Sequence, residues 1–175
     1  ELGKEEKVLL PKKQVPENSK IGDTLAVFIY RDSEDRLIAT TREPKMQLGE
    51  IALLAVKEVN QVGAFCDWGL EKDLFVPYKE QLFTPKIGKS YLVALYVDKS
   101  NRLCGTMRVY DFLQDSAPYK KDDMVHGTVY EVHREIGVFV AIDNKYHGVI
   151  PAKEVFGNFV PGDLVEARVT EVRED

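Results

Sequence analysis

The sequence predicts an all-β protein of small five-stranded barrels in tandem, and a repeated spacing of glycine and proline carries this prediction. Gly63 precedes Pro77 by 14 positions, and Gly137 precedes Pro151 by the same 14 positions. In both copies another glycine follows the proline after 11 positions. Internal repeats of this kind define the domain organisation. Five short strands in about 60 residues, joined by turns, are typical of a closed barrel of the OB type.

A first, partial unit is expected over residues 1–45. Pro11 and Gly22 repeat the spacing of 11 positions, so the chain is expected to begin part-way through this unit. Strands are expected over residues 24–30 and 37–41, on either side of a turn rich in Asp and Ser.

A complete second unit is expected over residues 46–113. Its five predicted strands, with a helical turn after the third, cover residues 49–60, 63–67, 74–76, 89–97 and 102–109. The composition of the first strand also allows a helix, but the β-branched run at the matching place in the next unit favours a strand. We expect this barrel to close, because closure leaves few sheet edges exposed.

A third unit is expected over residues 118–175, without its last strand. Its four predicted strands cover residues 124–131, 137–143, 147–150 and 164–172. Asp175 stands where the second unit has a turn and a fifth strand. We therefore expect the chain to be a fragment of a longer protein, with incomplete first and last barrels.

Composition limits the classes of function. With 44% hydrophobic and 30% charged residues, the 175-residue chain is expected to be globular rather than disordered. No apolar run approaches the roughly 20 residues that cross a bilayer. The first residues do not resemble a signal peptide, and two cysteines in apolar strands favour a reducing cytoplasm. The net charge of −5 falls entirely in residues 114–175, which hold seven basic and twelve acidic side chains.

Aromatic side chains on the outer faces of the predicted strands are the first candidates for a binding site. Phe65 and Phe139 alternate with small apolar residues, so they are expected to point away from the core. An outward ring beside polar groups suits base stacking; the alternative is packing at a domain junction or under a loop. Trp68 is expected either to extend the platform of Phe65 or to wedge between barrels. Tyr78 is expected either to stack on a base or to cap the barrel end.

Charged and polar side chains near these rings are the second set of candidates. Arg102 can contact phosphate or lie flat on a base, while Asp98 can accept from a base amine or close its turn and pair with Arg102. Four lysines of the middle unit are candidate phosphate contacts, although solvated surface charge explains each more simply: Lys57, Lys72, Lys79 and Lys99. In the third unit, the candidates expected on the face of Phe139 are His133, Lys145, Tyr146 and His147.

No catalytic or metal-binding constellation is visible in the sequence. The three histidines are His126, His133 and His147, and none has a zinc-site spacing to a cysteine or carboxylate. The chain also has no phosphate-cradling Gly-rich loop and no Gly-x-Ser-x-Gly motif. We therefore expect a protein that is not an enzyme and that uses no metal or cofactor.

The repeated motifs resemble a known domain. The run Gly-Val-Phe-Val-Ala-Ile-Asp from residue 137, followed by Gly-Val-Ile-Pro and Pro-Gly-Asp-Leu-Val-Glu-Ala-Arg-Val, resembles the S1 RNA-binding domain, named after a ribosomal protein. The run Gly-Ala-Phe-Cys-Asp-Trp-Gly-Leu from residue 63, followed by Asp-Leu-Phe-Val-Pro, is similar to the bacterial conserved virulence factor B family. That resemblance implies tandem S1-like domains and a C-terminal winged-helix domain beyond Asp175.

The resemblance also implies where RNA binds. The exposed strand-two aromatic of the S1 domain falls on Phe65 and Phe139. The Asp and Arg that flank its last hairpin fall on two pairs, which are Asp98 with Arg102 and, in the first unit, Asp32 with Arg36.

The chain departs from the S1 pattern at two places. The aromatic residue before the strand-two glycine is replaced by Val62 and Ile136, and the third-strand histidine is replaced by Pro77 and Pro151. These replacements remove a stacking ring and a hydrogen-bond donor.

The predicted function is non-catalytic binding of single-stranded or structured RNA, in the role of a post-transcriptional or virulence-type regulator of the bacterial cytoplasm. Aromatic rings would take bases, basic groups would take phosphates, and barrels in series would raise affinity through effective concentration. The alternative is a protein–protein interaction scaffold, because OB barrels are reused for many tasks. The acidic third unit favours a protein partner for that barrel. No membrane partner is expected.

Overall fold

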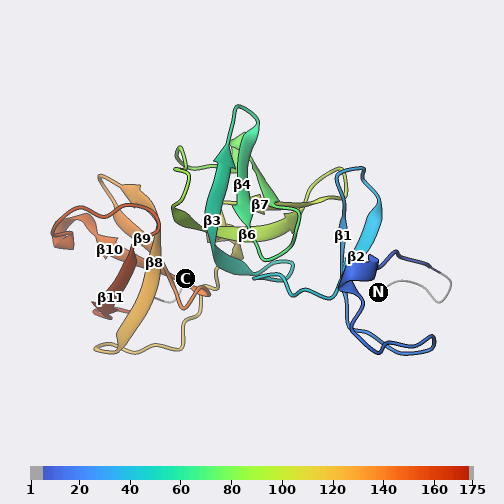
Figure 1. The fold of residues 1–175 in the computed structure, drawn as a ribbon. Helices are drawn as coiled ribbons and strands as arrows, with labels where there is room; N and C mark the ends of the chain where they lie inside the picture. Colours follow the sequence, from blue (N-terminus) through green and yellow to red (C-terminus); the bar gives the residue numbers. More distant parts are fainter. Residues whose placement is uncertain (1–5, 174–175) are drawn as a thin grey trace.

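The computed structural model describes residues 6–173, and within that range the chain forms three β-sheets and four 3-10 helices. The sheets lie in a row, with the largest in the middle (Figure 1). The predicted all-β class is confirmed, with one nearly complete barrel between two incomplete ones. No helix within residues 6–173 has the length and apolar character needed to span a membrane.

The middle sheet is a nearly closed antiparallel barrel. Its strands, in the spatial order β5-β4-β3-β6-β7, are β3 (Ile51–Val59), β4 (Gly63–Asp67), β5 (Leu74–Pro77), β6 (Ser90–Val97) and β7 (Leu103–Thr106). The edge strands β5 and β7 come so close that a Cβ at Gly105 would stand 2.9 Å from a methyl of Val76. The helix η2 (Tyr78–Glu80) links these edges, because Thr106 Oγ1 donates to Glu80 Oε2 at 2.8 Å.

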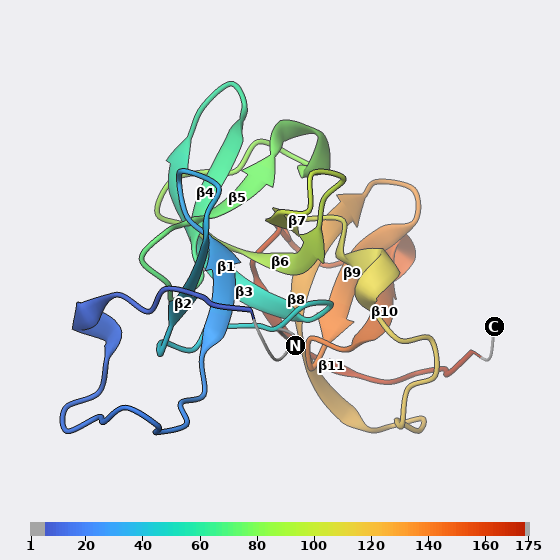
Figure 2. The same cartoon turned by 90° about the vertical axis from the view of Figure 1, so that its right-hand side faces the viewer.

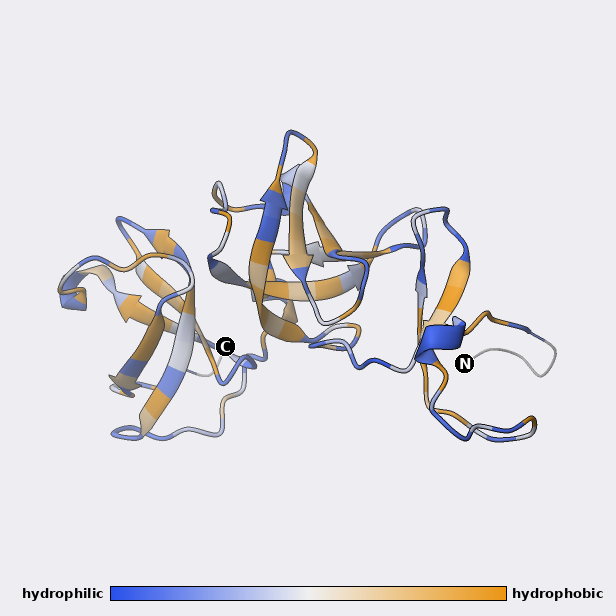
Figure 3. Cartoon of the chain, in the orientation of Figure 1, coloured by the Kyte–Doolittle hydropathy of each residue, from blue (hydrophilic) through white to orange (hydrophobic). Residues whose placement is uncertain are grey.

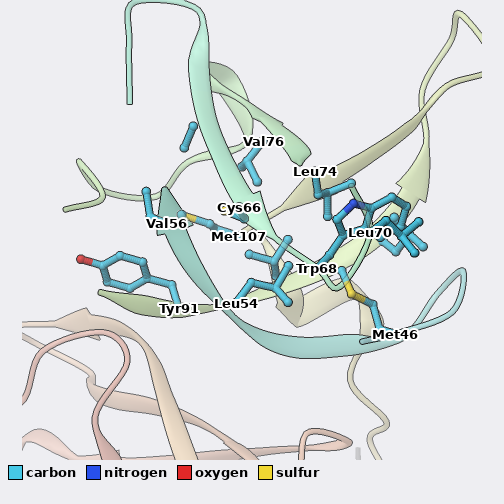
Figure 4. Packing of buried hydrophobic residues seen from close by; sticks show 13 residues of the cluster. Met46, Leu54, Val56, Cys66, Trp68, Leu70, Leu74, Val76, Tyr91 and Met107 are labelled. Atoms are coloured by element: carbon cyan, nitrogen blue, oxygen red, sulfur yellow. The ribbon is translucent and has the colours of Figure 1, made fainter. Parts of the chain in front are cut away.

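Alternate positions of the strands fill this barrel. Leu54, Cys66 and Val76, from three different strands, are fully buried and converge with Met107 (Figure 4). The residues between them face outward, as the two-residue period of a strand requires. Apolar residues accordingly concentrate on the strands of this sheet and polar residues on its turns (Figure 3). Burial raises the pKa of the Cys66 thiol to about 12, which fits a cysteine that fills the core.

The third sheet repeats the first four strands of the barrel. In the spatial order β10-β9-β8-β11, its strands are β8 (Met124–His133), β9 (Gly137–Ile142), β10 (Tyr146–Pro151) and β11 (Leu164–Arg168). The helix η4 (Ala152–Glu154) follows β10 as η2 follows β5. Both sheets have a β-bulge at the same place, and the extra residues are Lys57 in β3 and Tyr130 in β8. Lys57 and Tyr130 therefore occupy equivalent positions.

The first sheet has two strands within the described residues, β1 (Phe28–Arg31) and β2 (Leu37–Thr40), after the helix η1 (Lys12–Gln14). The predicted start of the first strand at residue 24 is wrong. Residues 24–27 pair with no strand, and β1 begins at Phe28. In the middle unit, the last strand ends at Thr106 instead of residue 109, and the chain turns into η3 (Val109–Phe112). The last strand of the third unit likewise ends early, at Arg168.

The first unit docks on the middle barrel through the aromatic side chains of Phe28 and Tyr30 and through several charged groups. Phe28 of β1 packs edge-on against Trp68, with ring centroids 5.7 Å apart and an interplanar angle of 84°. Lys13 Nζ lies 2.8 Å from Glu71 Oε1 across the same junction. This junction therefore combines apolar packing with exposed ion pairs.

The third unit docks on the other side of the barrel, where β8 lies beside β6 (Figure 2). A buried apolar cluster joins Val109 of η3 to Tyr130 of β8 and Ala141 of β9. Gly162, in the turn before β11, comes so close that a Cβ there would stand 2.4 Å from the carbonyl oxygen of Ser90. The contact between these two units is therefore tightly packed, at the level of backbone as well as side chains.

Candidate nucleic-acid interface

Two phenylalanine rings lie side by side on the outer face of the middle barrel. Phe65 of β4 is opposite Phe75 of β5, with ring centroids 5.2 Å apart and an interplanar angle of 34°. Their strand neighbours are buried in the barrel, so the alternation of the strands turns both rings outward. Each ring is half-buried, which leaves part of an aromatic surface open. Phe75 is not among the residues predicted from sequence, although the antiparallel register of the repeat places it beside Phe65.

The charges around this phenylalanine pair are balanced. Lys57 Nζ lies 3.1 Å from Asp73 Oδ1, and Lys45 Nζ lies 3.7 Å from Asp67 Oδ2. A hydrogen bond from the backbone N–H of Gly69 holds the pKa of Asp67 below its ordinary value, so this carboxylate stays ionised at neutral pH. The face therefore suits stacking on bases more than strong attraction of phosphate.

Trp68 does not extend the platform of Phe65. Its indole is 3% exposed and belongs to the barrel core, and Nε1 donates to the carbonyl oxygen of Lys72 at 2.6 Å. Its ring contacts Phe28 of the first unit. Of the two roles expected for this residue, the wedge between units is the one that its contacts match.

Asp98 closes its hairpin, and Asp32 does the same in the first unit. Asp32 accepts hydrogen bonds from the backbone N–H groups two and four residues later at 2.9 and 3.0 Å, and Asp98 does so at 2.8 and 3.0 Å. Asp35 and Asn101 take positive φ angles of 64° and 59° at the same point of the two turns, as three-residue hairpin loops require. Arg36 pairs with Asp32 at 2.9 Å. The repeated aspartates therefore have a structural explanation.

Arg102 contacts the first unit instead of pairing with Asp98 through its side chain. Its Nε lies 3.1 Å from Asp35 Oδ1, 67 residues away in sequence. Lys72 Nζ reaches the same hairpin and donates to the carbonyl oxygens of residues 31 and 32 at 3.0 and 3.1 Å. In this structure both cations, which were candidates for phosphate binding, tie the first unit to the barrel.

Three predicted contacts of the middle unit are open to solvent. Tyr78, in η2, is 69% exposed, so it does not cap the barrel end and its ring is accessible. Lys79, next to it, and Lys99, in the β6–β7 turn, are also exposed. These side chains border the barrel that carries the phenylalanine pair.

In the third unit, Phe139 of β9 and His147 of β10 lie together on the face that docks on the middle barrel, and Phe139 packs against the apolar cluster of this junction, which matches the alternative expected for it. Their ring centroids are 5.5 Å apart at an interplanar angle of 78°, and the ring of His133 lies 4.9 Å from Phe139 on its other side. The Oη of Tyr130 is 2.9 Å from His147 Nδ1. Tyr130 was not predicted as part of this site, since its equivalent in the middle unit is Lys57.

Tyr146 does not join this face. It precedes His147 in the same strand, so its side chain points to the opposite side of the sheet. There its ring packs edge-on against Tyr119, with centroids 5.5 Å apart. Burial raises the pKa of Tyr119 to about 12, and its hydroxyl hydrogen-bonds to Asp143. Lys145, in the β9–β10 turn, is exposed.

Comparison with known proteins shows the family of this chain. The S1 domain family matches residues 2–42 and 48–108. The chain belongs to the S1 domain family. The described residues contain no group of three or more His, Cys, Asp or Glu side chains placed to hold a metal ion.

Relatives of this S1 chain occur in several bacteria. The uncharacterized protein YitL of Bacillus subtilis is 29% identical over 98% of the chain, and conserved virulence factor B of Staphylococcus aureus is 23% identical over 86%. The chain spans 60% and 53% of the lengths of these two relatives. The predicted resemblance to the conserved virulence factor B family is thereby confirmed, at low identity.

A solved structure has a similar fold. It is a multidomain protein with nucleic acid binding domains from Streptococcus pneumoniae, matched with a TM-score of 0.63 and 25% identity. The match covers 99% of this chain and 64% of that protein. The likeness therefore extends over all three sheets.

Proposed function

We propose that this chain binds single-stranded RNA and catalyses no reaction. The observation that carries the proposal is the Phe65–Phe75 pair on the outer face of the nearly closed barrel. Adjacent, partly open rings suit successive bases of a single strand, because every base offers a face for stacking. Membership of the S1 family, and the nucleic acid binding domains of the Streptococcus pneumoniae protein, support nucleic acid as the partner.

A single strand is the preferred form of this ligand. Bases in a duplex are stacked on one another and cannot lie against a protein ring, whereas unpaired bases can be splayed out. Phosphate contacts would come from exposed groups such as Lys79 and Lys99, since Arg102 and Lys72 are held by the first unit. Few phosphate contacts imply a shallow dependence of affinity on salt.

The cellular role that we propose is regulation after transcription in the bacterial cytoplasm, for which the name of the virulence factor relatives is the support. The rival is a protein–protein scaffold. The excess of acidic residues in the third unit favours it for that unit. The two functions predict different behaviour toward RNA, so one titration separates them.

The test is fluorescence anisotropy with labelled oligo(U), oligo(A) and duplex RNA at two salt concentrations. We expect the single strands to bind more tightly than the duplex. Phe65→Ala should weaken that binding about 5- to 150-fold, the range of one stacked base, and Phe65→Tyr should retain it. Phe156→Ala, which removes an 86% exposed ring outside the platform, is the matched control and should change nothing. Absence of binding to every RNA would favour the scaffold.

A further inference from the structure

The aromatic rings at the junction between the middle barrel and the third sheet form one continuous row. Tyr110 of η3, which belongs to the middle unit, packs against His147 of β10 with ring centroids 5.0 Å apart and an interplanar angle of 82°. His147 contacts Phe139 at 5.5 Å, and Phe139 contacts His133 at 4.9 Å. Four rings from two structural units thus follow one another without a gap.

The outer side of this row is open. Tyr110 is 53% exposed, His133 is exposed, and Phe139 and His147 are half-buried. The perpendicular packing of His147 against both Tyr110 and Phe139 places an edge against a face, so within each pair only one ring face is covered by its partner. Phe139 also packs against Tyr130 and the apolar cluster of the junction, so the ring surface left for a ligand is mainly that of Tyr110 and His133.

The inner side of the row is fixed by Tyr130. This side chain is 3% exposed, and its Oη lies 2.9 Å from His147 Nδ1. Burial raises the pKa of Tyr130, so the hydroxyl stays protonated and can donate to that nitrogen. The apolar cluster around Tyr130 includes Val109 of η3, which holds the helix that carries Tyr110 against the third sheet. The row is therefore a preorganised surface.

The middle barrel has no such row. The position of His147 corresponds to Asp73, and that of Tyr130 corresponds to Lys57, which form an ion pair there. The row exists because aromatic residues replace this ion pair and because η3 of the preceding unit adds Tyr110. It is a property of two units together.

We propose that this row is a second stacking site, at which one RNA strand crosses from η3 of the middle unit onto the third sheet. The inference rests on the proposed function, and it adds that the two units share one composite site. An RNA strand bound across the junction would contact η3 of the middle unit at one end of the site and the third sheet at the other. The row contains no lysine or arginine, and Glu131 Oε1 lies 2.8 Å from His133 Nε2, so stacking is expected to dominate over phosphate attraction.

The decisive variant is Tyr110→Ala in the full 175-residue chain, titrated with a labelled oligo(U). We expect affinity to fall about 5- to 150-fold, the range for loss of one stacked base, while Tyr110→Phe retains the affinity. Because Tyr110 is 53% exposed, the variant should keep its circular dichroism spectrum and melting temperature. In a second measurement, oligonucleotides containing 4-thiouridine are cross-linked by light, and we expect adducts at Tyr110 or His147.

The outcomes separate the two proposals. If the wild-type chain binds RNA and Phe65→Ala weakens it, but Tyr110→Ala has no effect and no adduct maps to the row, the composite site is wrong and the proposed function stands. If the wild-type chain binds no RNA, both are wrong. Loss of affinity in Tyr110→Ala together with adducts in the row would support the composite site.

Discussion

The middle and third sheets share four strands and a β-bulge, yet their outer faces differ at two equivalent positions. In the middle sheet, the bulge residue Lys57 forms an exposed ion pair with Asp73 at 3.1 Å. In the third sheet, the bulge residue Tyr130 is buried and lies 2.9 Å from His147. The same backbone therefore supports either an ion pair or a buried tyrosine beside a histidine at these two positions. In the third sheet, the middle unit docks at this place through Val109 of η3.

The largest expected effect that tests this contrast comes from Tyr130→Ala. Removal of a buried aromatic side chain costs about 3–5 kcal/mol of unfolding free energy, and here it also opens the cluster that joins the third sheet to η3. Urea unfolding followed by circular dichroism measures the loss. Tyr130→Phe is the control and should cost about 0.5–1.5 kcal/mol, the range for one intramolecular hydrogen bond. A loss below 1 kcal/mol in the alanine variant would contradict the burial of Tyr130 at this junction.

A matched pair of glycines gives the next largest effect. Gly88 and Gly162 occupy equivalent turns with φ angles of 84° and 95°, so alanine at either is strained by about 1–2 kcal/mol. A Cβ at Gly88 meets nothing within 4 Å, whereas one at Gly162 stands 2.4 Å from the Ser90 carbonyl oxygen. We therefore expect Gly162→Ala to lower the melting temperature more than Gly88→Ala. Equal losses would mean that the two units do not dock this closely in solution.

The smallest expected effect is that of Asp73→Asn in the middle sheet. An exposed ion pair contributes about 0–1 kcal/mol, so the change in unfolding free energy should stay within that range. Salt screens such pairs, and the difference from the wild type should vanish in about 1 M NaCl. A larger, salt-resistant loss would show that the pair with Lys57 is as important to its sheet as Tyr130 is to the third.

The sheets could be predicted from sequence because their signals are local. Strand alternation, the positions of turn glycines and the spacing between Gly63 and Pro77 all lie within one hairpin or its neighbour. The register that places Phe65 beside Phe75 also depends only on the pairing of two consecutive strands, β4 and β5. These features are fixed by backbone pairing, which the repeat preserves.

The partners of several side chains could not be predicted, because they depend on how the units dock. Trp68 is buried partly by Phe28 of the first unit, and Arg102 meets Asp35 from a position 67 residues away. Tyr130 contacts both His147 of its own sheet and the apolar cluster that includes Val109 of η3. No local sequence pattern encodes contacts between units. The outward position of Phe65 could be predicted because it depends only on the alternation within its own strand.

The link from Arg102 to Asp35 has a consequence for the number of ligand contacts that a tandem array can offer. An arginine that pairs with a carboxylate of a neighbouring hairpin is not free to bind a phosphate. The middle unit thereby has one fewer cation for a ligand, and the first unit has one more contact with the barrel. A cation that a neighbouring unit holds in this way is not counted among the ligand contacts, so the number of phosphate contacts expected from sequence falls as the units dock.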